Sequence, residues 1–136
     1  MSLFSRLVLM GGACGLGNVA PVSEFNIHVD PEAAHIVFET ESLEIYMVPL
    51  DVTNTALVTN DIMDSIRDIR TNFSSFLVDL LLFIKHRMDH FTGGLWPETP
   101  LHDPCAIAFV VDPSIFEFRL LRVDVEMVCK IFYFFF

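Results

Sequence analysis

The sequence predicts an α/β fold in which a mostly parallel sheet is flanked by helices. Short apolar runs alternate along the chain with segments of helical periodicity, the order typical of strands joined by helical crossovers. Residues 7–10 form a continuous apolar run that stops at two glycines, as expected for a strand buried on both faces. Residues 43–50 favour a second strand, and the alternating residues 119–127 favour a third.

The first helices are predicted from the residues at their ends. Asp30 can cap a helix whose first position is Pro31, and Glu32 then faces the positive end of the helix dipole. A helix is therefore expected over residues 31–40. A longer helix with a broad apolar stripe is expected over residues 73–91, before a loop rich in glycine and proline.

Two more helices are expected on either side of the long one. Residues 59–61 form a capping cluster, and the helix after it carries three isoleucines on one face, Ile62, Ile66 and Ile69. Residues 102–104 open another apolar helix that continues over residues 105–111, with Asp103 as a candidate N-cap.

Composition limits the kind of protein this is. The 136 residues are enough for one domain, and an apolar fraction of 53% can build a core. A formal charge of -10 without clustered Lys or Arg argues against nucleic-acid binding. The longest apolar stretch, residues 76–84, contains Asp79 and is far shorter than the roughly 20 residues that span a membrane. Three cysteines without a CxxC motif predict free thiols, so we expect a soluble cytoplasmic protein.

Several short motifs could carry chemistry, and each has a plainer interpretation. Residues 15–20 match G-x-G-x-x-A, but Pro21 would disrupt the helix that a dinucleotide site needs. His86 and His90 have the spacing to chelate a metal ion, although two polar residues at the outer end of a helix are the simpler explanation. Cys105 could pair with a nearby histidine as a nucleophile or could simply be a packed thiol.

A set of polar residues beside apolar segments is a candidate joint site. Its members are Asn18, Glu24, Asn26, His102 and Asp103. Taken singly, each of them is also typical of a helix cap or a turn. Extended backbone at residues 24–26 would point the first and last of these side chains to the same side.

Longer motifs in a fixed order carry a resemblance to a known family. Residues 9–12 (LMGG), 17–26 (GNVAPVSEFN), 29–34 (VDPEAA), 47–53 (MVPLDVT), 102–106 (HDPCA) and 123–126 (VDVE) follow one another along the chain. This succession resembles the inosine/uridine-preferring nucleoside hydrolase family over about residues 5–127. The resemblance implies a Rossmann-like fold and an enzyme that cleaves the N-glycosidic bond of purine or pyrimidine ribonucleosides with water, giving ribose and free base for nucleoside salvage.

The resemblance also implies roles for individual residues. Met10, Asn18, Glu24 and Asn26 match positions that line the ribose pocket. His102 matches a residue that protonates the leaving base, a task suited to an imidazole. Asp103 matches a ligand of a bound calcium ion, which prefers carboxylate oxygens. The implied partner is a small nucleoside, and homo-oligomers are expected of the complete family enzyme.

The sequence departs from the family in ways that affect these expectations. The family motif D-x-D-P-G-x-D-D, which supplies the remaining calcium carboxylates and the base that deprotonates water, has no counterpart here. We therefore expect residues 1–127 to be the C-terminal part of a hydrolase domain truncated at both ends, inactive alone, with residues 128–136 an unrelated apolar tail. The alternative is a non-catalytic ribose- or nucleoside-binding or interaction module that has lost its metal site.

Overall fold

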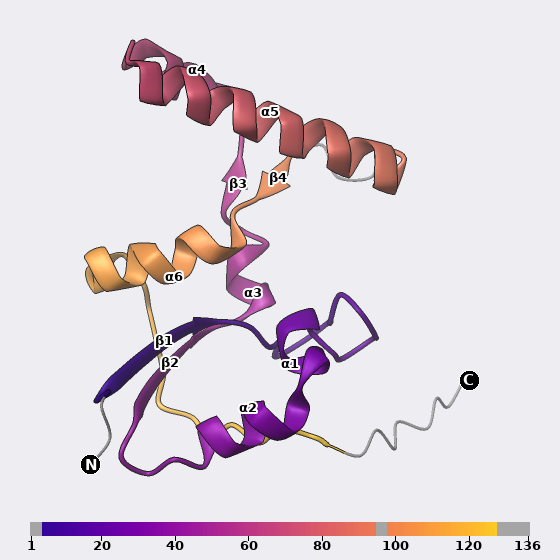
Figure 1. The fold of residues 1–136 in the computed structure, drawn as a ribbon, viewed down its shortest axis with the longest axis vertical. Coiled ribbons are helices and arrows are strands. Elements are labelled where there is room, and N and C mark those ends of the chain that lie inside the picture. Colours follow the sequence, from indigo (N-terminus) through magenta and orange to yellow (C-terminus); the bar gives the residue numbers. More distant parts are fainter. Residues whose placement is uncertain (1–3, 95–97, 128–136) are drawn as a thin grey trace.

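A computed structural model describes residues 4–94 and 98–127 of the chain (Figure 1). Two parallel strands, β1 (Arg6–Met10) and β2 (Glu44–Val48), and two short antiparallel strands, β3 (Leu57–Val58) and β4 (Thr99–Pro100), form its sheets. The helices are α1 (Phe25–Val29), α2 (Pro31–Phe38), α3 (Leu50–Thr53), α4 (Asn60–Asp68), α5 (Asn72–Thr92), α6 (His102–Val111) and the 3-10 turn η1 (Pro113–Ile115).

The parallel pair confirms the predicted fold class. Arg6 lies opposite Glu44 and Met10 lies opposite Val48, so the carboxyl ends of β1 and β2 meet at one edge. Helix α6 packs against β1, and α1 and α3 lie at the carboxyl edge of the two strands (Figure 1). The side chains of residues 7–10 are half-buried rather than buried on both faces, because β1 has only β2 beside it among the described strands.

Helix ends follow the capping signals in the sequence. The Asp30 carboxylate accepts a hydrogen bond from the Ala33 N–H at 2.9 Å, and Pro31 occupies the first position of α2, both as predicted. The Thr59 hydroxyl caps α4 in the same way. Helix α5 begins with a capping box between Thr71 and Ser74 that the prediction overlooked.

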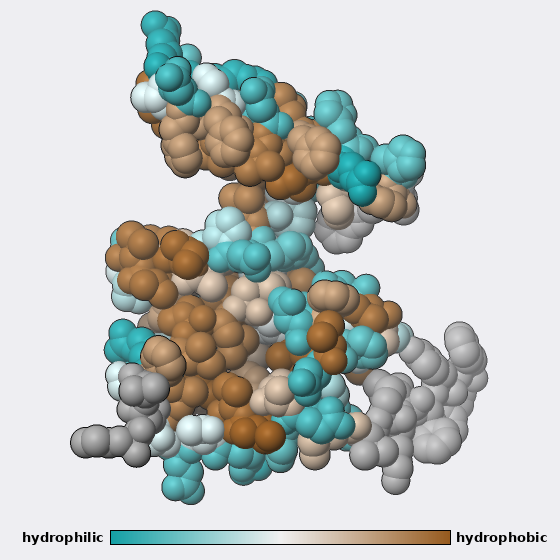
Figure 2. Space-filling view, viewed as in Figure 1, coloured by the Kyte–Doolittle hydropathy of each residue, from teal (hydrophilic) through white to brown (hydrophobic). Residues whose placement is uncertain are grey.

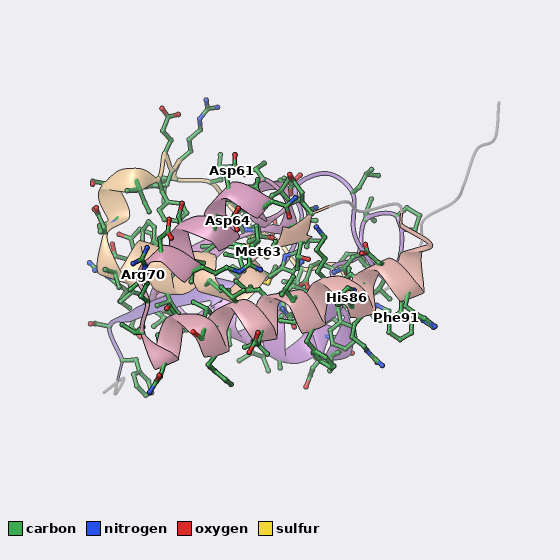
Figure 3. All side chains as sticks on the ribbon, turned by 90° about the horizontal axis from the view of Figure 1, so that it is seen from above. Asp61, Met63, Asp64, Arg70, His86 and Phe91 are labelled. Carbon is green, nitrogen blue, oxygen red and sulfur yellow. The ribbon has the colours of Figure 1, made fainter. Side chains whose placement is uncertain are left out.

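Helices α4 and α5 form an arm that β3 and β4 connect to the rest of the molecule (Figure 1). Met63 points from α4 toward α5, whereas Asp61 lies on the opposite side of α4 (Figure 3). A small core of Val58, Met63 and Leu81 results. The predicted face of α4 was therefore wrong in part, since Ile62 and Ile69 are exposed and only Ile66 packs against this core.

Apolar side chains cover much of the visible surface (Figure 2). Exposed apolar side chains of α5 include Phe73, Phe76 and Phe83, and those of α6 include Ile107 and Val110. Other apolar residues of α5 are buried: Val78 and Leu81 are hardly exposed, and Leu81 belongs to the arm's core. Among the described residues, no helix combines the length and apolarity that crossing a bilayer requires.

Several segments differ from the sequence prediction. Residues 119–127 form no strand, because no described strand lies beside them; they run as irregular backbone past α1 and α2. Helices α1 and α3 were not predicted, and Leu50 begins α3 instead of ending β2. Helix α6 begins at His102 with Leu101 as its N-cap, so Asp103 lies in the first turn and is not the cap. The predicted tail, residues 128–136, lies outside the described residues.

Candidate functional site

Glu24 connects the end of β1 to the start of α1. Its side chain is 3% exposed, and one carboxylate oxygen, Oε2, accepts hydrogen bonds from the Gly12 N–H at 2.9 Å and the Ile27 N–H at 3.3 Å. The other oxygen accepts from the Asn26 N–H at 2.9 Å. The carboxylate therefore pairs with free backbone N–H groups at the start of α1 and holds the backbone at Gly12 against this helix.

Residues 17–23 form a compact loop between β1 and α1. The Ser23 carbonyl accepts from the N–H groups of Asn18, Val19 and Ala20, and the Pro21 carbonyl accepts from the Gly17 N–H at 2.9 Å. The Asn18 side-chain oxygen accepts from the Phe25 N–H at 2.9 Å and so attaches the loop to α1. No helix begins directly after the glycines, in agreement with the predicted effect of Pro21 on a dinucleotide site.

Gly17 is required by the close approach of backbone inside this loop. A Cβ atom at this position would lie 2.2 Å from the Ser23 carbonyl oxygen and 2.4 Å from that of Ala20. We expect Gly17→Ala to lower the free energy of unfolding by about 3 kcal/mol, because backbone atoms cannot turn aside as a side chain can. Urea unfolding followed by circular dichroism measures this loss.

Gly15→Ala is the matched control for that experiment. Its added Cβ would meet the Asp51 side-chain oxygen at 2.9 Å, and this exposed side chain can rotate away at the cost of the hydrogen bond that it accepts from the Cys14 N–H. Equal destabilisation by the two alanines would show that the loop does not depend on the close approach at Gly17.

Asn26 and Met10 meet at the carboxyl end of β1. The Asn26 side-chain N–H2 group donates to the Met10 carbonyl at 3.3 Å and contacts the Met10 sulfur at 3.4 Å. Asn26 and Asn18 are exposed, and Met10 is half-buried. The structure thus brings together all four residues that the resemblance assigned to a ribose pocket, with Glu24 as their buried centre.

The neighbouring strand joins the same edge through backbone hydrogen bonds. The Gly11 N–H donates to the Val48 carbonyl at 3.2 Å, and the Leu50 N–H donates to the Gly12 carbonyl at 3.0 Å. Helix α3, which starts at Leu50, contacts α6. Its last residue, Thr53, has its hydroxyl 2.8 Å from Nδ1 of His102. His102 is therefore connected to the carboxyl edge of the sheet through its contact with α3.

Asp103 can serve as a ligand of the implied calcium ion only together with further oxygen ligands close to it. Asp103 is exposed in the first turn of α6. Within residues 4–94 and 98–127, no three His, Cys, Asp or Glu side chains gather closely enough to hold a metal ion. Calcium takes six to eight oxygen ligands, so Asp103 and its described surroundings do not fit a calcium ion on their own.

A cavity of about 380 Å³ lies next to Glu24. Its wall is largely apolar and includes Val22, Ile27 and residues 123–127. Met10, Asn18, Asn26 and His102 do not line it. The exposed polar groups at the end of β1 and this cavity are therefore separate features that share Glu24.

The remaining candidates have structural explanations. The Cys105 thiol is buried and donates to the Leu101 carbonyl at 2.9 Å, and burial raises its pKa, so it is a packed thiol rather than a nucleophile. Cys14 is an exposed free thiol. His86 and His90 are exposed on α5 (Figure 3 labels His86), and in the described part of the chain they belong to no group of three or more His, Cys, Asp or Glu side chains that could hold a metal ion.

Comparison with known proteins relates this arrangement to one family. The family model described as "Inosine-uridine preferring nucleoside hydrolase" matches residues 1–131. A Leishmania major protein of that name is 42% identical over 124 residues, which cover 90% of this chain and 38% of that protein. A "Pyrimidine-specific ribonucleoside hydrolase RihA" from Salmonella paratyphi C is 44% identical over 113 residues, or 82% of this chain and 35% of its own length.

Solved structures give the same result. The "Purine-Preferring Ribonucleoside Hydrolase from Gardnerella vaginalis" superposes with a TM-score of 0.79 at 35% identity, covering 92% of this chain and 39% of its own. The chain thus spans well under half the length of the relatives it matches. The sequence match over nearly all its residues, together with this structural match, places the chain in the inosine-uridine preferring nucleoside hydrolase family.

Proposed function

We propose that this chain carries the ribose-facing and base-facing part of a nucleoside hydrolase site, which cleaves the bond between ribose and base with water. The supporting observation is the gathering of Met10, Asn18, Glu24 and Asn26 at the carboxyl end of β1. Ligands of open α/β sheets bind outside the carboxyl ends of the strands, which is where these residues lie.

Each group has a chemical task in this proposal. The exposed amides of Asn18 and Asn26 offer donors and acceptors to the hydroxyls of a ribose ring. The negative Glu24 favours the positive charge that develops on the sugar as the glycosidic bond breaks. His102 supplies a proton to the departing base, so that the base leaves as a neutral molecule.

Calcium belongs to this proposal only through the family. The ion implied by the resemblance would take Asp103 as one ligand and would orient the ribose diol and a water. Among the described residues, no further carboxylates gather beside Asp103 to complete a calcium site. The roles proposed for Asn18, Asn26, Glu24 and His102 therefore do not depend on the ion. Cytoplasmic location and oligomer formation also stay predictions.

The proposed substrate class comes from the substrates named for the relatives. Their names cover inosine-uridine, pyrimidine and purine preferences. We therefore propose ribonucleosides as a class, without a preferred base.

The test uses the 136-residue chain and a chimera. In the chimera, residues 1–127 replace the matching segment of the Leishmania major protein. We expect the chain alone to release no ribose from inosine or uridine with or without Ca²⁺, because one carboxylate cannot hold the ion. We expect the chimera to hydrolyse at least one of these nucleosides. A folded but inactive chimera would contradict the proposal.

The absence of a metal-binding group among the described residues also favours a second candidate, a nucleoside-binding module without catalysis. Calorimetric titration of the chain with uridine or inosine, without calcium, distinguishes the two. Binding by a monodisperse chain together with an inactive chimera would support the module, and hydrolysis by the chimera would support the enzyme.

A further inference from the structure

Asp51 connects the segment after β1 to the start of α3. Its carboxylate oxygen Oδ2 accepts a hydrogen bond from the Cys14 N–H at 2.6 Å, across 37 residues of sequence. Building on the function proposed above, we infer that Asp51 is a positioning residue: its carboxylate holds residues 13–16 against α3 and so fixes Asn18, in the compact loop that follows, where it meets ribose.

Two carboxylates from different helices hold the backbone of this segment. Glu24, the N-cap of α1, accepts from the Gly12 N–H at 2.9 Å. Asp51, in the first turn of α3, accepts from the Cys14 N–H two residues later. The Leu50 N–H, directly before Asp51, donates to the Gly12 carbonyl at 3.0 Å. The segment is therefore attached to both helices before the chain enters the compact loop.

The Asp51 carboxylate lies against two successive residues of the segment. A Cβ atom added at Gly15 would be 2.9 Å from its other oxygen, Oδ1. Residues 14–16 are exposed, so packing contributes little to holding them in place. A hydrogen bond from a backbone N–H to a charged carboxylate is stronger than one to a neutral acceptor. The contact with Asp51 is therefore well suited to fix this exposed stretch.

The compact loop is held from two sides. On one side, the Asn18 side-chain oxygen accepts from the Phe25 N–H of α1 at 2.9 Å, which leaves the Asn18 N–H2 group for a ribose hydroxyl. On the other side, residues 13–16 connect the loop to β1 and, through Asp51, to α3. If the attachment to Asp51 is lost, the bond to Phe25 holds the loop alone, and the loop can pivot about it. Asn18 then spends less time where it binds ribose.

Amide exchange at Cys14 tests the contact directly. The full chain is labelled with ¹⁵N-cysteine, the Cys14 signal is assigned with Cys14→Ser, and exchange of its amide proton with water is measured by NMR. We expect Asp51→Ala to raise this exchange rate about 10-fold, because a hydrogen bond to a charged group is lost. Cys105, which is buried in α6, should exchange as before and is the internal reference for the fold.

Three further variants make this measurement specific. Gly15→Ala, whose Cβ displaces the carboxylate, should also raise the Cys14 rate, whereas Asp51→Asn keeps an accepting oxygen and should stay within about 3-fold of the unmodified chain. Asp61→Ala removes an acid from the first turn of α4, in the arm, and should change nothing (Figure 1). An unchanged Cys14 rate in Asp51→Ala overturns the inference. An equal rise at Cys105 also overturns it, because Asp51 would then support the whole fold.

Kinetics in the chimera supply the functional readout. We expect Asp51→Ala to raise KM about 10-fold and to change kcat less than about 3-fold, because a misplaced Asn18 weakens ribose binding, whereas a smaller folded fraction lowers only the apparent kcat. Asp51→Asn should recover most of the KM, and Asp61→Ala should leave both constants unchanged. A lower kcat at unchanged KM contradicts the positioning role. An inactive chimera with the expected exchange at Cys14 would instead refute the proposed function and leave the contact in place.

Discussion

Replacement of His102 by alanine in the chimera is expected to lower kcat for inosine or uridine by about 10²- to 10⁴-fold, the usual contribution of a positioned acid. The base is a poor leaving group as an anion, so loss of the proton donor raises the barrier to bond cleavage. KM should change little, because the ribose contacts come from Asn18 and Asn26. Steady-state release of ribose measures both constants.

A substrate with a different leaving group separates this role from a general loss of structure. 4-Nitrophenyl riboside loses a phenolate that is stable without a proton, so His102→Ala should slow its hydrolysis far less than that of inosine. His35→Ala is the control and should leave both substrates unaffected, because α2 lies away from α3 and α6 (Figure 1). Equal losses on the two substrates would contradict the role of His102 as an acid.

Local signals in the sequence predicted most of the elements, because helix starts depend on neighbouring residues. Asp30 caps α2 and Thr59 caps α4 through bonds to residues only three positions away. Helices α1 and α3 were missed because they have five and four residues, too few to show a period. The strand predicted over residues 119–127 failed for the opposite reason, since alternation describes a strand but does not supply its partner.

The candidate site was only partly open to prediction from the sequence. The motifs of the family resemblance contain Asn18, Glu24 and Asn26, and the structure gathers them. The Glu24 carboxylate accepts three hydrogen bonds from backbone N–H groups, and one of the donors, Gly12, is twelve residues away. The spacing of residues in the sequence does not predict that the chain brings Gly12 back to the start of α1. Thr53 was overlooked because a threonine at the end of an apolar segment has no special signal until the fold brings His102 against it.

Glu24→Gln is expected to lower the free energy of unfolding by about 3 kcal/mol, the largest loss that we predict for a single polar side chain. Both carboxylate oxygens accept from backbone N–H groups, of Gly12 and Ile27 on one side and Asn26 on the other. A glutamine has one accepting oxygen, and its N–H2 group must face at least one of these donors. Denaturant unfolding of the chimera and of the chain, where it is soluble, measures the loss.

This substitution also separates capping of α1 by Glu24 from a direct contact with ribose, which is distinct from the effect of its charge on bond cleavage proposed above. If its main task is to cap α1, Glu24→Gln destabilises the fold, and the remaining folded protein binds nucleoside normally. If its main task is to contact ribose, the fold keeps its stability and nucleoside binding weakens. The exposed Glu32→Gln, in the first turn of α2, is the control and should cost about 0.5 kcal/mol through the helix dipole. Because the Glu24 side chain is 3% exposed and bonded through both oxygens, we expect the first result.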